Sequence, residues 1–262
     1  MHFEYIKHVC LTICVLYQIQ SATASCKDQV CESLVDIGVN TRPDWKYIQF
    51  SHWLPIRRRY LEANTFGSMP HLTYITLTRM VNGTNRYAFN GLIRLNTVVS
   101  KDNVLLHLPD ELFQNNPLMQ KIVIKNCQLE DIGTGLFQNL PLLSHVNLEG
   151  NRIENIEKEM FPRSLVELIL KNNQINFIGE DTFHKMKKLQ NLDLSENKLH
   201  SFEIDNTLRL FPKMTVAWFA MNPLTCDCFK DMMKYTTENK VKVLYNYEEE
   251  WNNYRKCNEN NR

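Results

Sequence analysis

Apolar residues recur along this chain in one frame that returns about every 24 residues, a spacing typical of repeat proteins. In residues 165–178, offsets 0, 3, 5, 8, 10 and 13 carry Leu165, Leu168, Leu170, Asn173, Ile175 and Ile178. The same frame begins again at Leu143 and Leu189, with a variant at Met119, and less regular frames begin at Trp45, Leu72, Leu95 and Met214. Each unit can bury its apolar side only against a neighbour, so the pattern predicts stacked coils that each contain one short strand.

The half of each unit that follows the strand carries one further apolar residue. We expect these side chains to fill the core opposite the strands, because the leucine positions alone occupy only one side of each coil. The predicted residues are Phe66, Phe89, Phe113, Phe137, Phe161, Phe183 and, in the seventh unit, Leu208.

Two motifs resemble those of extracellular leucine-rich-repeat proteins. The first is the repeat itself, L-x-x-L-x-L-x-x-N-x-L-x-x-L, and the second is Asn222-Pro223-Leu224-Thr225-Cys226-Asp227-Cys228, which is similar to the start of their C-terminal cysteine cap. Toll-like and Slit-like ectodomains and soluble insect immune proteins share this architecture. The resemblance implies an α/β repeat fold: a curved leucine-rich-repeat solenoid with a concave parallel β-sheet and disulfide-stapled end caps.

Four segments are predicted from these patterns. Residues 1–24 resemble a signal peptide, because the apolar run Val9–Tyr17 is short and Ala22-Thr23-Ala24 forms an A-x-A cleavage signal. A membrane anchor is the alternative, but it needs about 20 apolar residues. Residues 25–44 would form the N-terminal cap, residues 45–221 about eight repeats, and residues 222–262 the C-terminal cysteine cap and tail, with a short helix at Phe229–Lys240.

The cysteines indicate an oxidising compartment, because after the leader most of the remaining ones gather near the two ends of the chain. We expect a small Cys26–Cys31 loop in the N-terminal cap. The resemblance pairs Cys226 with Cys257 and leaves Cys228 outside this pair, as a thiol or in an intermolecular disulfide. Cys127 occupies the asparagine position of its repeat, which predicts a buried thiol.

Side chains in each strand alternate between the core and the outer face, so offsets 2, 4 and 6 should line the concave surface. A binding role is open to these residues, although exposed lysines are more often merely solvated and the tryptophan could instead pack under the cap. The candidate contact residues are Lys101, Lys121, Val123, Lys125, Glu149, Ile169, Lys171 and Trp218.

Nothing in the sequence indicates catalysis. Nucleophile, zinc-protease and phosphate-loop motifs are absent, and the histidines lie in different repeats without metal-ligand spacing, so we expect no enzyme activity, cofactor or metal. The formal net charge of +1 does not favour nucleic acid as a partner. Asn82-Gly83-Thr84 is a glycosylation sequon, and Asn82 is the expected attachment site.

The sequence therefore predicts a secreted, non-enzymatic protein that binds a protein or glycoconjugate on its concave β-face. Innate immunity and receptor signalling are the processes that the resemblance implies. The alternative is a matrix or assembly component that acts through its caps and through disulfide-linked oligomers, because a leftover cysteine in a secreted chain can join two copies. No second apolar run is long enough to span a membrane.

Overall fold

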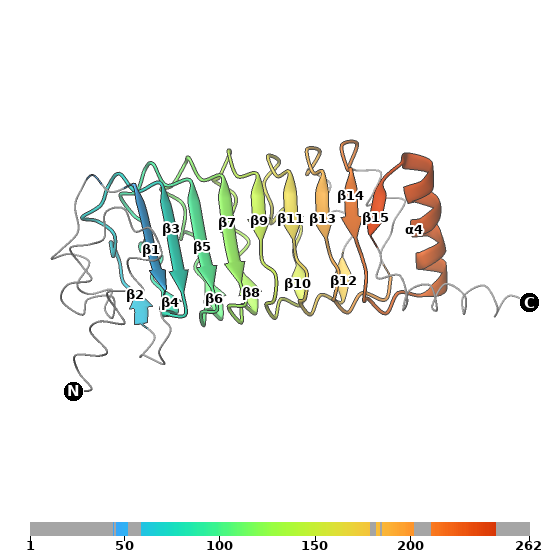
Figure 1. Cartoon of the computed structure of the whole chain (residues 1–262), viewed down its shortest axis with the longest axis horizontal. Coiled ribbons are helices and arrows are strands. Elements are labelled where there is room, and N and C mark those ends of the chain that lie inside the picture. Colours follow the sequence, from blue (N-terminus) through green and yellow to red (C-terminus); the bar gives the residue numbers. More distant parts are fainter. Residues whose placement is uncertain are drawn as a thin grey trace, which may run out of the picture.

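The computed structural model describes residues 44, 46–51, 59–178, 182–183, 185–201 and 211–244. Within them, short strands lie side by side in one elongated solenoid, with α4 at its C-terminal end (Figure 1). This arrangement confirms the predicted repeat solenoid. The predicted signal peptide and nearly all of the N-terminal cap lie outside the described residues, as do Cys26, Cys31, Trp45, Leu208 and Cys257.

The described part of the chain contains a parallel sheet of nine strands, in which consecutive repeats supply neighbouring strands. Eight strands begin two residues after the eight predicted frame starts, which confirms the frame. The ninth, β15, was not predicted, and it pairs with the last repeat strand. In sheet order the strands are β1 (Tyr47–Ser51), β3 (Tyr74–Thr78), β5 (Thr97–Lys101), β7 (Lys121–Lys125), β9 (His145–Asn147), β11 (Glu167–Ile169), β13 (Asn191–Asp193), β14 (Val216–Trp218) and β15 (Lys242–Leu244).

Short strands on the opposite side of the coils form three two-stranded pairs among the described residues. They join neighbouring repeats and enclose the core between themselves and the large sheet. The pairs are β2 (Arg59–Leu61) with β4 (Val81–Thr84), β6 (His107–Leu108) with β8 (Asp131–Ile132), and β10 (Asn155–Ile156) with β12 (Phe177–Ile178).

The predicted phenylalanines fill the core side away from the sheet. Phe66, Phe89 and Phe113 stack in succession, with ring centroids 5.7 and 5.5 Å apart. Phe183 also contacts Phe211, with ring centroids 5.8 Å apart, and Phe211 lies at the turn position that Leu92 and Met186 hold in other repeats. These large buried side chains join repeats that are distant in sequence, and removing one would leave a cavity that costs about 3–5 kcal/mol.

The asparagine position ties each coil to the one before it. The Nδ2 group of Asn173 donates to the carbonyl oxygens of Leu148 and Leu170 at 3.0 and 2.9 Å, and its Oδ1 accepts from the amide of Ile153 at 3.2 Å. A side-chain amide supplies donors and an acceptor that strand-end backbone groups would otherwise lack. The same bonding pattern recurs at Asn103, Asn151, Asn197 and Asn222.

In the seven repeats whose strand exit is described, the residue just before the asparagine position adopts the left-handed backbone region, with φ between 53° and 72°. This turn directs the chain out of the strand at the same point in these repeats, so the side chains beside it form rows along the solenoid. Only one of these residues is a glycine, although that conformation costs other residue types roughly 1 kcal/mol or more. They are Arg79, Asp102, Asn126, Gly150, Asn172, Glu196 and Met221.

Helix α4 (Cys226–Asn239) covers the C-terminal end and leads into β15. It begins three residues before the predicted start at Phe229, because the Thr225 side chain caps it by accepting a hydrogen bond from the Cys228 amide. It ends at the left-handed residue Lys240. In the described ranges, no helix is long and apolar enough to cross a membrane.

Candidate recognition surface

The outer face of the nine-stranded sheet, called the sheet face here, is lined by columns of side chains that run across the strands. In β9, β11, β13 and β14 the first and third residues are partly exposed and the middle one is buried, which is the expected alternation. Strand register aligns Lys121 with His145 and Val123 with Asn147, so residues from separate repeats become direct neighbours.

The middle column of the sheet face is the most covered. Val99 and Val123 are only 6% and 8% exposed, so Val123 offers a partner little surface. Ile169 and Trp218 in the same column are half-buried. Trp218 is aligned with Asp193 on one side and with Leu244 of β15 on the other, so the sheet continues beyond the tryptophan.

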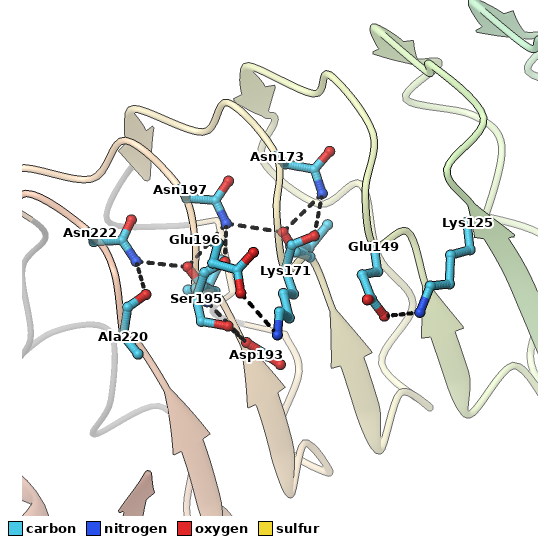
Figure 2. A network of polar contacts seen from close by, with 12 residues as sticks. Lys125, Glu149, Lys171, Asn173, Asp193, Ser195, Glu196, Asn197, Ala220 and Asn222 are labelled. Atoms are coloured by element: carbon cyan, nitrogen blue, oxygen red, sulfur yellow. Dashed lines mark hydrogen bonds and ion pairs between the residues drawn. The ribbon is translucent and has the colours of Figure 1, made fainter. Parts of the chain in front are cut away.

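Two of the predicted contact lysines are neutralised by carboxylates of the next repeat. The Nζ atom of Lys125 lies 2.8 Å from Glu149, and that of Lys171 lies 3.0 Å from Glu196 (Figure 2). The hydrogen bond from Lys171 to Glu196 is the main cause that raises the pKa of Lys171 above 10.5, with partial burial opposing it. The positive potential of the predicted lysine-rich centre is therefore smaller than the sequence indicates.

Lys101 and Lys121 differ from that pair because both are exposed and neither forms an ion pair with any described residue. They stand on β5 and β7, which are adjacent strands. Two uncompensated cations on a firm sheet are the clearest candidates for contacts with an acidic group of a partner.

The acidic side of the sheet face begins at β9 and β11. His145 Nε2 lies 3.8 Å from the Glu167 carboxylate, and its Nδ1 lies 2.7 Å from the Ser144 hydroxyl. That hydroxyl also lies 3.2 Å from the Gln120 carbonyl, so it belongs to a local polar network at the start of β9. The cluster is a polar surface, and the described residues hold no group of three His, Cys, Asp or Glu that could bind a metal.

Asp193 completes the acidic side on β13. Its carboxylate accepts hydrogen bonds from the amide and hydroxyl of Ser195, which fix its orientation toward the sheet face. The sheet face is therefore divided by charge, with open cations on β5 and β7 and carboxylates on β11 and β13.

An aromatic pair lies at the N-terminal end of the sheet face. The rings of Tyr47 and Tyr74 stack with centroids 4.7 Å apart and planes inclined by 17°. Burial is the main cause that raises the pKa of the Tyr47 phenol above 10.0, and the neighbouring Tyr74 adds to it. Tyr47 remains 51% exposed, so the pair offers a flat apolar surface with polar edges.

The glycosylation candidate Asn82 is exposed on β4. It sits at an irregularity, because Arg59 is aligned with Val81 whereas Tyr60 is aligned with Gly83. The Tyr60 ring lies against Gly83, where an added Cβ would approach the ring to 2.7 Å. This close approach explains why glycine occupies the middle of the sequon.

The structure places the described cysteines in different settings. Cys226 is exposed and disulfide-bonded, and because its predicted partner Cys257 lies outside the described residues, the pairing stays a prediction. Cys228 is 7% exposed within the apolar core, so its sulfur could join a second chain only after the cap opens. Cys127 is a fully buried thiol, as predicted, and its sulfur lies 3.5 Å from the Ser100 hydroxyl.

Two contributors to this surface are not evident from the sequence. Glu196 was not recognised as the partner of Lys171, because it lies one position beyond the outward column and reaches back through the left-handed turn. The strand β15 was missed because only three residues form it and they follow a helix instead of a repeat frame. The only available signal for β15 was the β-branched and aliphatic composition of Val241, Val243 and Leu244.

This repeat architecture matches a known protein family. The family described as the BspA-type leucine-rich-repeat region matches residues 59–190, in 6 copies, which is just over half of the 262 residues. The chain belongs to this leucine-rich-repeat family. Members are built from repeats that expose one face of a parallel sheet, and this supports a role in binding or recognition.

The solved structure titled as the TLR13–ssRNA13 complex contains a chain with a similar leucine-rich-repeat fold. The match has a TM-score of 0.61 at 18% sequence identity, and it covers 74% of this chain but only 31% of that chain. At this identity the likeness concerns the fold alone. Among curated proteins, none matches this chain in sequence.

Proposed function

We propose that this protein is a secreted, non-enzymatic recognition protein that binds a protein or glycoconjugate partner on the sheet face. The observation that carries the proposal is the pair of exposed, uncompensated lysines on β5 and β7, on the same sheet as the half-buried apolar side chains Ile169 and Trp218. Such a surface combines charge complementarity with apolar anchors, the usual ingredients of a binding site.

The rigidity of the sheet favours tight binding. Backbone ladders and the buried amides of Asn173 and Asn197 hold neighbouring strands in register, so little conformational freedom is left to lose when a partner docks. The charge division gives the partner a fixed orientation, with its acidic groups toward Lys101 and Lys121 and its basic groups toward Glu167 and Asp193.

Secretion and glycosylation belong to the same proposal. Residues 1–24 have the features of a cleaved leader, and Asn82 is exposed as an attached glycan requires. We infer a protein or glycoconjugate partner from the side chains of the sheet face. The complexed RNA of the structural neighbour carries no argument here, because ion pairing removes much of the positive charge that a polyanion would need on this face.

The test begins with affinity capture of partners from extracellular fluid by residues 25–262. Binding of the captured partner is then measured with Lys101→Glu/Ile169→Ser, which changes two partly or fully exposed side chains of the sheet face. The control, Lys198→Glu/Phe177→Ser, makes comparable changes, one charge reversal and one apolar-to-serine substitution, at exposed positions outside the nine-stranded sheet. A selective loss of binding in the first variant supports the proposal, and an equal loss in both variants contradicts it.

A further inference from the structure

Seven tight turns lead into the strands β3, β5, β7, β9, β11, β13 and β14, and they form a row along one long edge of the solenoid (Figure 1). In each turn the fourth residue donates its amide hydrogen to the carbonyl oxygen of the first, as Leu95 does to Leu92 at 3.0 Å and Leu143 to Leu140 at 3.1 Å. The first residue is mostly buried and the fourth always is, so the two central residues point to solvent. We call this row of turns the entry edge.

Three successive turns each carry an exposed aliphatic side chain between their first and fourth residues. Ile93, Leu118 and Leu142 are 62%, 44% and 46% exposed, and they precede the adjacent strands β5, β7 and β9. Exposed aliphatic side chains scattered singly are ordinary on protein surfaces. Leu118 and Leu142 occupy the same position of their turns, and Ile93 lies one position earlier in its turn, beside the exposed Arg94. Three such side chains on neighbouring repeats form an apolar strip, which indicates a contact surface.

The next three turns carry only positive charge. Arg163, Lys187, Lys188 and Lys213 are exposed, and none of them forms an ion pair with a described residue. Asp and Glu are absent from all seven turn segments, which are residues 69–73, 92–96, 116–120, 140–144, 162–166, 186–190 and 211–215, although the chain contains 29 of these residues.

The opposite edge, where the chain leaves the strands, has a different electrostatic character. There Arg79 is paired with Asp102 at 3.3 Å and Arg152 with Glu130 at 3.2 Å. Lys198, which also lies away from the entry edge, donates to the side-chain oxygen of Gln174 at 2.9 Å and not to a carboxylate. Positive charge is therefore partly compensated on that side, whereas none of the four basic residues of the entry edge is paired with a described carboxylate. The formal net charge of the chain is only +1.

We propose that the entry edge docks on an anionic lipid bilayer. The aliphatic tips at Ile93, Leu118 and Leu142 enter the headgroup region, and the basic side chains at Arg163, Lys187 and Lys188 contact the phosphates. A soluble polyanion would use the basic residues but gain nothing from the apolar tips, whereas a bilayer uses both. The row of turns lets several tips meet one membrane surface together, and the proposal involves a different surface from the sheet face.

The test measures co-sedimentation of the full chain with vesicles of phosphatidylcholine, with and without phosphatidylserine. The protein should bind the vesicles that contain phosphatidylserine and should be released as salt screens the charges. Lys187→Glu/Lys188→Glu should weaken binding by about tenfold or more. The control Arg152→Glu/Lys198→Glu makes the same change of net charge at exposed positions on the other edge, and it should bind like the wild type.

Leu118→Ser/Leu142→Ser tests the apolar strip and should also weaken vesicle binding, while leaving the thermal unfolding midpoint unchanged because both side chains are exposed. Ile169→Ser on the sheet face should leave vesicle binding unchanged, so this test is separate from that of partner binding. The proposal is overturned if phosphatidylserine vesicles are not bound, if they are bound equally by both charge variants, or if only a soluble sulfated polysaccharide is captured.

Discussion

The ammonium group of Lys171 lies 3.0 Å from the carboxylate of Glu196, although the two residues belong to different repeats. The left-handed conformation of Glu196 directs its side chain back over the preceding coil. Contacts of this kind decide which charges of the sheet face are open to a partner.

Replacing Glu196 by glutamine should lower the pKa of Lys171 toward its ordinary value of 10.5, because the largest cause of the upward shift is removed. A raised pKa means that the contribution of the pair to stability is complete below 10.5 and is lost as pH rises through the folded-state value. NMR titration of the lysine side chains, with Lys171→Met for assignment, checks the shift. An unchanged Lys171 titration in Glu196→Gln would show that the pair does not form.

The stacked tyrosines give a second titration test. In Tyr74→Ala the Tyr47 ring loses its neighbour, so the pKa of its phenol should fall toward 10.0. Because the folded protein favours the protonated phenol, this contribution to stability is also lost at high pH. Ultraviolet absorbance titration detects the change, and Tyr47→Phe identifies the signal. If Tyr47 titrates identically with and without the Tyr74 ring, the stacked geometry is wrong.

The buried amide of Asn173 should be essential for stability. Asn173→Ala leaves the amide of Ile153 without its acceptor and removes one of the two side-chain donors to the carbonyl of Leu148, which should lower the free energy of unfolding by about 1–3 kcal/mol. Chemical denaturation measures the loss. The control is Asn155→Ala, the same substitution at an exposed position, which should change stability by less than about 0.5 kcal/mol. Equal effects at both positions would argue against the asparagine ladder.

Replacing Asn116 should increase the free energy of unfolding, in contrast to replacing Asn173. Its Oδ1 atom is buried with no hydrogen-bond partner in the described part of the chain, while the equivalent positions in neighbouring repeats hold buried Leu92 and Leu140. The carbonyls that accept from its Nδ2 group, those of Phe89 and Leu92, also accept backbone hydrogen bonds and stay satisfied without it.

Asn116→Leu should therefore raise the free energy of unfolding by about 1–3 kcal/mol, because it removes an unsatisfied buried acceptor. The reciprocal change, Leu140→Asn, should lower it by a similar or larger amount. Thermal and chemical unfolding measure both variants. Destabilisation by Asn116→Leu would mean that the amide has a structural role that its hydrogen bonds do not reveal.

The repeat frame was predictable because it depends on local spacing. The positions of Leu168, Asn173 and Phe183 follow from a period that each coil repeats, and the structure buries all three. The frame also aligned the outward columns, since parallel strands of equal offset pair in register. The local periodicity of the sequence was therefore sufficient to predict most of the fold.

Features that depend on contacts between repeats were harder to predict. The neutralisation of Lys125 by Glu149 requires knowing which rotamers meet across the sheet, and the covering of Val123 depends on the side chains of both neighbouring strands. The Phe183–Phe211 contact was not predicted, because Phe211 lies three residues before its frame start and the other phenylalanines of regular repeats lie six before theirs. Spacing alone does not contain this information.

Recognition through the sheet face is tested most directly by the affinity of the captured partner for Lys101→Glu/Ile169→Ser, compared with wild type and with Lys198→Glu/Phe177→Ser. Isothermal titration calorimetry should show a loss of about tenfold or more in the first variant only, since loss of one anchor and reversal of one charge each cost about 1 kcal/mol or more. Wild-type affinity in the sheet-face variant would contradict the proposed function.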